Sequence, residues 1–168
     1  MQYHNITHDD LLNGDGIRVV LWVAGCEHHC KGCQNPITWN PDGGEPFTAK
    51  EIDEIFAELE KDYVSGITFS GGDPLHPANR NMVYNIARII SQSYPNKTVW
   101  MYTGYTWEQI LENEELLAVM EVVDVLVDGR FEESLLDKKA HWVGSTNQRI
   151  IDVAKSLKTG GVVLHESN

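Results

Sequence analysis

The chain has 168 residues, 42% hydrophobic and 23% charged, a composition typical of one globular domain. Its 13 basic and 25 acidic residues give a net charge of −12, which disfavours nucleic-acid binding because phosphate contacts need clustered Lys and Arg. The longest apolar run, residues 19–25, is too short to cross a bilayer, and residues 1–5 lack the pattern of a secretory signal. We therefore expect a cytoplasmic protein with neither a nucleic-acid nor a membrane partner.

The first part of the chain leads to its cysteines. Residues 1–16 are polar and end in Asn13-Gly14-Asp15-Gly16, a strong turn signal. Residues 17–24 are almost all β-branched or apolar, which predicts a strand buried on both faces. All three cysteines, at positions 26, 30 and 33, follow this strand, and the segment 35–44 then predicts a loop.

The spacing C-x3-C-x2-C brings three thiols into one short loop, and an odd number of thiols cannot all pair with one another. Three thiolates can bind three irons of a [4Fe-4S] cluster and leave the fourth iron open for a substrate. A zinc site completed by His28 or His29 is one alternative, and a thioredoxin-like pair at Cys30 and Cys33 is another. Structural zinc sites usually take their ligands in two pairs. The sequence holds no second pair, so the spacing slightly favours iron–sulfur. Clustered free thiols also fit a reducing cytoplasm.

From residue 48 onward, predicted helices alternate with predicted strands. Thr48 with Glu51, and Thr106 with Gln109, form capping boxes that mark two helix starts. This alternation implies parallel strands joined by right-handed crossovers. A complete eightfold barrel typically needs about 250 residues, so we expect an α/β fold with an incomplete barrel or open sheet of mostly parallel strands. The strands are predicted at 66–69, 98–102 and 123–127, and the helices after 48, at 79–92 and after 106.

Small or polar residues stand at the carboxyl end of each predicted strand. After the cysteines come Ser70-Gly71-Gly72-Asp73, Thr103-Gly104 and Asp128-Gly129. The carboxyl ends of parallel strands are where ligands bind in such folds. Glycines allow close backbone approach, and the carboxylates of Asp73 and Asp128 can accept hydrogen bonds from an amine or from ribose hydroxyls. Each segment alone could be a plain turn, but four such ends on one rim argue against coincidence.

The pattern weakens beyond Phe131. Residues 135–137 predict a short helical piece, and residues 141–149 have no simple periodicity. Residues 162–164 indicate either a late strand or a tail that orders on a partner. We expect one domain over residues 1–153, followed by a C-terminal tail of undefined order at 154–168.

The chain resembles the radical S-adenosylmethionine superfamily through Cys26-x3-Cys30-x2-Cys33 and Gly71-Gly72-Asp73-Pro74. It is most similar to the glycyl-radical activases of anaerobic ribonucleotide reductase, and this resemblance covers roughly residues 1–153. One departure from the superfamily is Gly32, where an aromatic residue usually stands, which affects how the adenine is packed. The pattern of the activases is matched by Asn13-Gly14-x-Gly16-x-Arg18, Cys33-x-Asn35, and the segments 70–77, 103–105, 125–131 and 144–149.

The resemblance implies a radical S-adenosylmethionine type of incomplete (β/α) barrel and a set of cofactor residues. Cys26, Cys30 and Cys33 would ligate a [4Fe-4S] cluster, whose fourth iron S-adenosylmethionine would chelate through its amino and carboxylate groups. Backbone carbonyls of the glycine pair would meet the amine, with the following aspartate supporting that loop. The residues implied to bind S-adenosylmethionine are Gly71, Gly72 and Asp73, with Gly32, Cys33 and Gln34 against the adenine, and Thr103 and Asp128 as further candidates for its carboxylate or ribose.

The resemblance also implies a reaction and its partners. Reductive cleavage of S-adenosylmethionine would produce a 5′-deoxyadenosyl radical. That radical would take hydrogen from a glycine Cα on the large subunit of the anaerobic ribonucleoside-triphosphate reductase. A flavodoxin-type protein would donate the electron. Trp39 and Trp142, in irregular segments, are predicted to contact the reductase. The alternatives are a pyruvate formate-lyase activase-like or deazapurine synthase-like enzyme, and a non-enzymatic zinc-binding interaction module.

Overall fold

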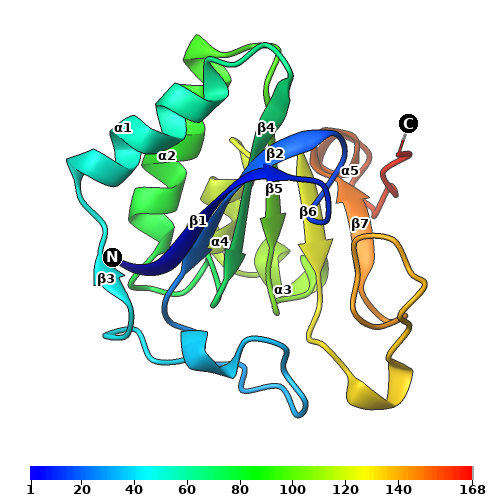
Figure 1. The fold of residues 1–168 in the computed structure, drawn as a ribbon. Helices are drawn as coiled ribbons and strands as arrows, with labels where there is room; N and C mark the ends of the chain where they lie inside the picture. Colours follow the sequence, from blue (N-terminus) through cyan, green and yellow to red (C-terminus); the bar gives the residue numbers. More distant parts are fainter. Residues whose placement is uncertain (168) are drawn as a thin grey trace.

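A computed structural model describes residues 1–167, which form one seven-stranded sheet with helices packed against it (Figure 1). The strands are β1 (Gln2–Asp10), β2 (Ile17–Val23), β3 (Glu45–Pro46), β4 (Val64–Gly71), β5 (Thr98–Tyr102), β6 (Val125–Asp128) and β7 (Arg149–Asp152). The helices are α1 (Ala49–Leu59), α2 (Arg80–Ser93), α3 (Trp107–Leu111), α4 (Glu114–Met120) and α5 (Val153–Thr159), with short 3-10 helices η1 (Pro36–Thr38) and η2 (Glu133–Leu135).

The sheet is open and mixed, with the order β3-β1-β2-β4-β5-β6-β7. The α/β class is confirmed, and the four central strands β2, β4, β5 and β6 are parallel as predicted. The pairings of β1 with β2, β1 with β3, and β6 with β7 are antiparallel, so the sheet is mixed rather than mostly parallel. Only residues 11–16 separate β1 from β2, and so short a connection cannot make the crossover that parallel pairing requires.

Helix starts follow the capping boxes read from the sequence. Thr48 accepts a hydrogen bond from the backbone of α1 while Glu51 bonds back to the Thr48 backbone. Thr106 and Gln109 do the same at the start of α3. Each box satisfies amide groups that the first helical turn leaves without partners. Helices α1 and α3 belong to the connections that lead into β4 and β6, and each begins after a loop at the carboxyl edge of the sheet.

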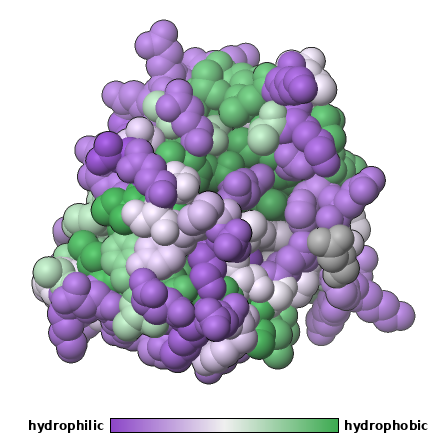
Figure 2. All heavy atoms as spheres, turned by 90° about the horizontal axis from the view of Figure 1, so that it is seen from above, coloured by the Kyte–Doolittle hydropathy of each residue, from purple (hydrophilic) through white to green (hydrophobic). Residues whose placement is uncertain are grey.

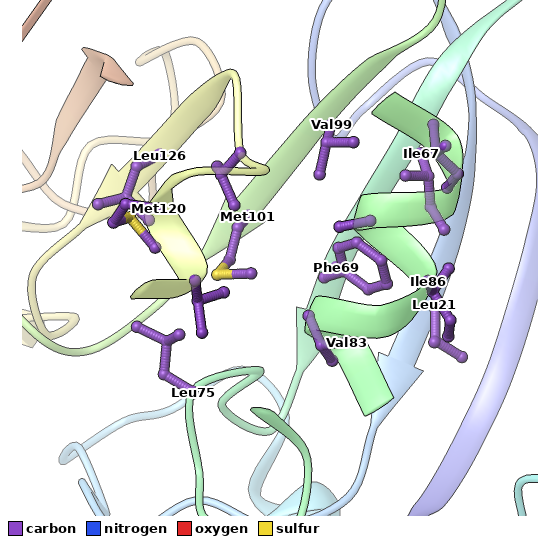
Figure 3. Close-up of a cluster of buried hydrophobic side chains, with 14 of the residues drawn as sticks. Leu21, Ile67, Phe69, Leu75, Val83, Ile86, Val99, Met101, Met120 and Leu126 are labelled. Carbon is purple, nitrogen blue, oxygen red and sulfur yellow. The ribbon is translucent and has the colours of Figure 1, made fainter. Parts of the chain in front are cut away.

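The main core lies between the sheet and its helices. Alternate residues of the parallel strands, such as Leu21, Phe69 and Met101, are fully buried against Val83 and Ile86 of α2 (Figure 3). The carboxyl ends of β4, β5 and β6 point downward in Figure 1, and the loops that follow them lie below the packed core. On the end seen in Figure 2, polar and apolar side chains are interspersed. No helix within residues 1–167 is long and apolar enough to span a membrane.

The opposite face of the sheet carries a smaller cluster around Trp100. Arg18 of β2 is fully buried beside it, with its guanidinium carbon 5.5 Å from the centre of the Trp100 ring. The guanidinium donates to the carbonyl of Ile67 at 2.7 Å and to that of Thr98 at 2.8 Å. Burial lowers the pKa of Arg18 to about 10. A Cβ on Gly14 would lie 2.8 Å from Trp100, so the segment Asn13-Gly14-x-Gly16-x-Arg18 is a packing element.

The C-terminal segment returns to this second face. After α5, residues near Leu164 form a single antiparallel bridge with Ile151 rather than the late strand that was one of the predictions. The ring of His165 then packs edge-on against Trp100 at 5.2 Å, and its Nε2 lies 2.7 Å from Asp15 Oδ2. His165 thereby ties the C-terminal segment to the turn between β1 and β2.

Candidate cofactor site at the carboxyl edge of the sheet

A cavity of about 340 Å³ opens at the carboxyl ends of the parallel strands. This volume lies within the range of small-molecule sites. Its walls come from the loops after β2, β4, β5 and β6 and from residues 140–148. Most of the residues predicted from the sequence line it, namely Cys26, Cys30, Cys33, Gln34, Gly71, Gly72, Asp73 and Thr103. Gly32 instead lines a neighbouring pocket, and Asp128 lies behind the wall.

The cysteine loop leaves the end of β2 and is held by backbone hydrogen bonds. Gly25 donates to the Thr38 carbonyl at 2.7 Å, and Cys26 donates to that of Trp39 at 3.1 Å. Gly25 has φ 108°, a conformation open to glycine, which turns the chain away from the strand. The 3-10 helix η1 thus serves as a support for the loop.

The three thiols are free and half-buried. Burial raises the pKa of Cys26 to about 11 and also raises that of Cys30. Both thiols are therefore protonated near neutral pH in the absence of a metal. Because metal ligands must be thiolates, binding of a metal or cluster at these cysteines would release these protons.

The three free thiols line the same cavity, and their chemistry suits the irons of a [4Fe-4S] cluster. Within residues 1–167, no three His, Cys, Asp or Glu side chains converge closely enough to hold one metal ion. A tetrahedral zinc would draw its ligands to about 2.0–2.3 Å from one centre, whereas a [4Fe-4S] cluster binds each thiolate through a different iron. His28, a proposed zinc ligand, is instead hydrogen-bonded to Asp73.

The glycine pair at the end of β4 packs directly on the end of β2. The amide of Gly72 donates to the Val23 carbonyl at 2.7 Å, and the amide of Asp73 donates to the Gly25 carbonyl at 2.7 Å. A Cβ on Gly72 would lie 2.5 Å from that same Gly25 oxygen. Because this segment runs so close to the cysteine loop, only glycine fits at position 72 without moving the backbone.

Asp73 is 2% exposed and joins the loops of the rim. Its Oδ1 accepts from the Leu75 amide at 2.8 Å and from Thr103 Oγ1 at 3.0 Å. Its Oδ2 accepts from the Gly104 amide at 3.0 Å and lies 2.6 Å from His28 Nε2. The carboxylate therefore supports the loops, and the hydroxyl of Thr103 is directed to it.

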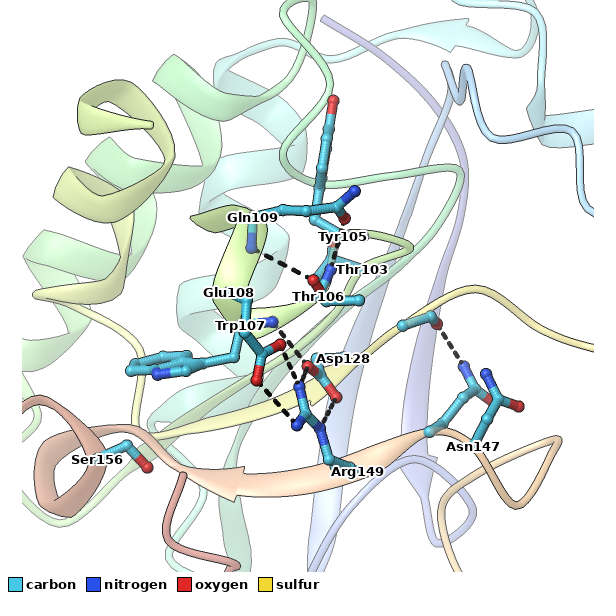
Figure 4. A network of polar contacts seen from close by, with 12 residues as sticks. Thr103, Tyr105, Thr106, Trp107, Glu108, Gln109, Asp128, Asn147, Arg149 and Ser156 are labelled. Carbon is cyan, nitrogen blue, oxygen red and sulfur yellow. Dashed lines mark hydrogen bonds and ion pairs between the residues drawn. The ribbon is translucent and has the colours of Figure 1, made fainter. Parts of the chain in front are cut away.

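The carboxylate of Asp128, at the end of β6, is likewise hydrogen-bonded to other residues of the chain (Figure 4). It is 1% exposed and accepts from Arg149 of β7 and, at 2.7 Å, from the Trp107 amide at the start of α3. These contacts with Asp128 and with Glu108 raise the pKa of Arg149. Asp128 thus anchors the wall segment 129–131 from outside the cavity.

Several wall residues were missed by the sequence analysis. Trp22, Tyr102, Phe131 and Val143 line the cavity, as does Trp142, which also packs on Trp100 at 6.3 Å between ring centroids. The strand periodicity would have placed Trp22 and Tyr102 on the face away from the helices, but no periodic signal exists for residues 141–149. The prediction that Trp142 and Trp39 contact a partner stays a prediction, and Trp39 packs on the His29 ring at 4.7 Å.

Comparisons with known proteins give a consistent result. A family model described as a 4Fe-4S single cluster domain matches residues 12–151. A protein of Enterobacteria phage T4 is 43% identical over 150 residues, covering 89% of this chain and 93% of its own. Relatives from Vibrio cholerae and Escherichia coli K12 are both 39% identical, covering 89% and 88% of this chain and 97% and 96% of their own. All three relatives are named anaerobic ribonucleoside-triphosphate reductase-activating protein.

Proposed function

This chain belongs to the family of anaerobic ribonucleoside-triphosphate reductase-activating proteins and contains its 4Fe-4S single cluster domain, and we propose that it activates such a reductase by forming a glycyl radical on it. The observation that carries this proposal is the meeting of three free cysteines and a glycine pair in one cavity. When bound, a [4Fe-4S] cluster and S-adenosylmethionine would supply one-electron cleavage of the sulfonium and removal of a hydrogen atom from a glycine of the reductase.

The residues of the chain would bind and orient these groups. Cys26, Cys30 and Cys33 would hold the cluster and leave one iron free of protein ligands. The backbone at Gly71 and Gly72 would receive the amino group of S-adenosylmethionine, since no side chain obstructs approach there. Cys33 and Gln34 would lie against the adenine, with Gly32 shaping the turn of that loop. The aromatic and apolar walls would limit access of water to the bound cofactor.

Thr103 and Asp128 would act through their neighbours. The hydroxyl of Thr103 donates to Asp73, and Asp128 is bonded to Arg149, so both would shape the pocket for the carboxylate and ribose without binding them directly. We also propose a flavodoxin-type electron donor and a cytoplasmic location, because free thiols and a reduced cluster need a reducing compartment. The incomplete-barrel type of the fold and its single domain at 1–153 belong to the same proposal.

The proposal is tested by anaerobic purification and spectroscopy. We expect a brown protein containing iron and acid-labile sulfide, whose reduced cluster gives an EPR spectrum that changes when S-adenosylmethionine is added. Incubation with the reductase, a reductant and S-adenosylmethionine is expected to give a glycyl-radical EPR doublet. A colourless protein with one zinc ion would overturn the cluster, and an intact reduced cluster that yields no doublet would overturn the activation.

A further inference from the structure

We propose that His28 is a positioning residue, which fixes Asp73 and through it the Gly71–Gly72 backbone in the orientation that binds S-adenosylmethionine. This inference rests on the function proposed above and concerns the same cavity. His28 belongs to the cysteine loop, two residues from both Cys26 and Cys30. A contact from this residue to the glycine segment therefore links the two halves of the site.

The geometry of His28 is that of a fixed side chain. Its side chain is 7% exposed, and its Nε2 donates to Asp73 Oδ2 across 2.6 Å. The ring packs edge-on against Tyr105, with 4.7 Å between ring centroids. A hydrogen bond to a buried carboxylate is among the stronger contacts that a neutral or charged imidazole can make.

The loop after β5 is shaped around this histidine. A Cβ on Gly104 would lie 2.3 Å from the His28 ring, so this position has room only for glycine. The amide of Gly104 donates to the same oxygen, Asp73 Oδ2, at 3.0 Å. Three loops, which follow β2, β4 and β5, thus converge on one carboxylate.

Asp73 has no oxygen left over for a ligand. Its two oxygens accept from Leu75, Thr103, Gly104 and His28, each within 3.0 Å. The aspartate of the Gly-Gly-Asp segment is therefore a support, and the groups free to meet the cofactor's amine are those of the glycine backbone. Removing His28 would leave one buried carboxylate oxygen short of a donor and remove the side-chain contact between the cysteine loop and this segment.

The adjacent histidine provides a matched comparison. His29 lies in the same loop but does not line the cavity and makes no hydrogen bond to Asp73. Its ring packs on Trp39 instead. Its φ of 47° is left-handed, a conformation that asparagine tolerates. The same substitution, histidine to asparagine, can therefore be made at both positions, and only the one at 28 removes a donor to Asp73.

The test measures cofactor affinity separately from cluster content. Wild type, His28→Asn, His28→Gln and His29→Asn are reconstituted anaerobically, and iron and sulfide are determined for each. S-adenosylmethionine is then titrated and followed by calorimetry and by the EPR spectrum of the reduced cluster. The glutamine amide can reach the place of Nε2, whereas the shorter asparagine amide cannot.

We expect equal cluster content in all four proteins, an affinity lowered about tenfold in His28→Asn, and affinities within about threefold of wild type in His28→Gln and His29→Asn. Wild-type affinity in His28→Asn would overturn the inference alone and leave the proposed function intact. Cluster loss in His28→Asn that glutamine does not reverse would also overturn it, because His28 would then be a folding residue. A wild-type protein that loads a cluster but does not bind S-adenosylmethionine would overturn the proposed function itself.

Discussion

Arg149 of β7 closes on Asp128 of β6 through two contacts, Nε to Oδ1 at 3.0 Å and Nη2 to Oδ2 at 2.5 Å. The carboxylate is 1% exposed, whereas the side chain of Arg149 is 33% exposed. The pair therefore joins the last two strands of the sheet across an antiparallel pairing and holds the wall of the cavity behind Gly129.

Loss of this arginine should destabilise the protein strongly. Arg149→Ala leaves the buried carboxylate of Asp128 without its cation, for which we expect a loss of about 3 kcal/mol in the free energy of unfolding. Urea denaturation of the metal-free protein measures it. Glu108 is the matched control, because it contacts the same guanidinium from an exposed position. Glu108→Ala should cost less than about 1 kcal/mol, and equal costs for the two variants would contradict this account.

The tight turn before β2 should not tolerate a side chain at Gly14. A Cβ there would meet Trp100 and the Arg18 side chain within 3 Å, and its φ of 127° disfavours any other residue. Gly14→Ala should therefore lower the free energy of unfolding by about 2 kcal/mol or more. Gly161 has no neighbour within 4 Å of such a Cβ, so Gly161→Ala should change stability by less than about 0.5 kcal/mol. Chemical denaturation of both variants checks this, and an undisturbed Gly14→Ala would show that the turn is not constrained.

Gly72 should be required for binding of S-adenosylmethionine, and its substitution should not remove any of the three cysteine ligands. A Cβ at this position would collide with the Gly25 carbonyl oxygen, which lies in the cysteine loop. We expect Gly72→Ala to weaken binding of S-adenosylmethionine by about tenfold or more, measured by calorimetry on the reconstituted protein. Iron content distinguishes displacement of the cofactor segment alone from collapse of the whole loop. Unchanged affinity would show that this backbone does not contact the cofactor.

Each cysteine should be needed for the cluster but not for the fold. Cys26→Ser, Cys30→Ser and Cys33→Ser should each lose most of their iron and sulfide after reconstitution, because a [4Fe-4S] cluster with two protein thiolates is poorly held. Circular dichroism of the metal-free variants should match that of wild type, since the three thiols lie outside the hydrophobic core. Full iron content in any one variant would remove that cysteine from the ligand set.

The C-terminal segment should contribute measurably to the stability of the protein through His165. Its bond to Asp15 and its packing on Trp100 are lost in His165→Ala, for which we expect a decrease of about 1 kcal/mol in the free energy of unfolding. Hydrogen exchange should become faster in the turn at residues 11–16. Iron content and the affinity for S-adenosylmethionine should stay unchanged, because His165 is not part of the cavity wall. No change in exchange would mean that the contact is not maintained in solution.

The parts of the fold that were predictable are those specified by local sequence. The strand Thr98–Tyr102 agrees with its prediction, and the two capping boxes mark helix starts as expected. Strand β1 was missed because its residues are mostly polar and only partly buried. Its hydrogen-bonded pairing with β2, which the local sequence does not show, stabilises it as a strand. Strand β7 was missed because four residues are too few to show a period, and antiparallel pairing with β6 decides their structure.

The site divides in the same way. The meeting of the three cysteines with Gly71 and Gly72 at one cavity could be predicted, because their spacing and their positions after predicted strands are visible in the chain itself. The bond from His28 to Asp73 joins residues 45 positions apart, and the bond from Arg149 to Asp128 joins residues 21 apart. Such pairings depend on how loops meet in space, so the sequence indicated Asp128 as a ligand group where the structure gives it a protein partner.

Trp142 connects the cavity to the buried layer formed by Arg18 and Trp100, since it lines the cavity and packs on the Trp100 ring. Neither Arg18 nor Trp100 lines the cavity, so a substitution in this buried layer should reach the cavity wall through the contact with Trp142.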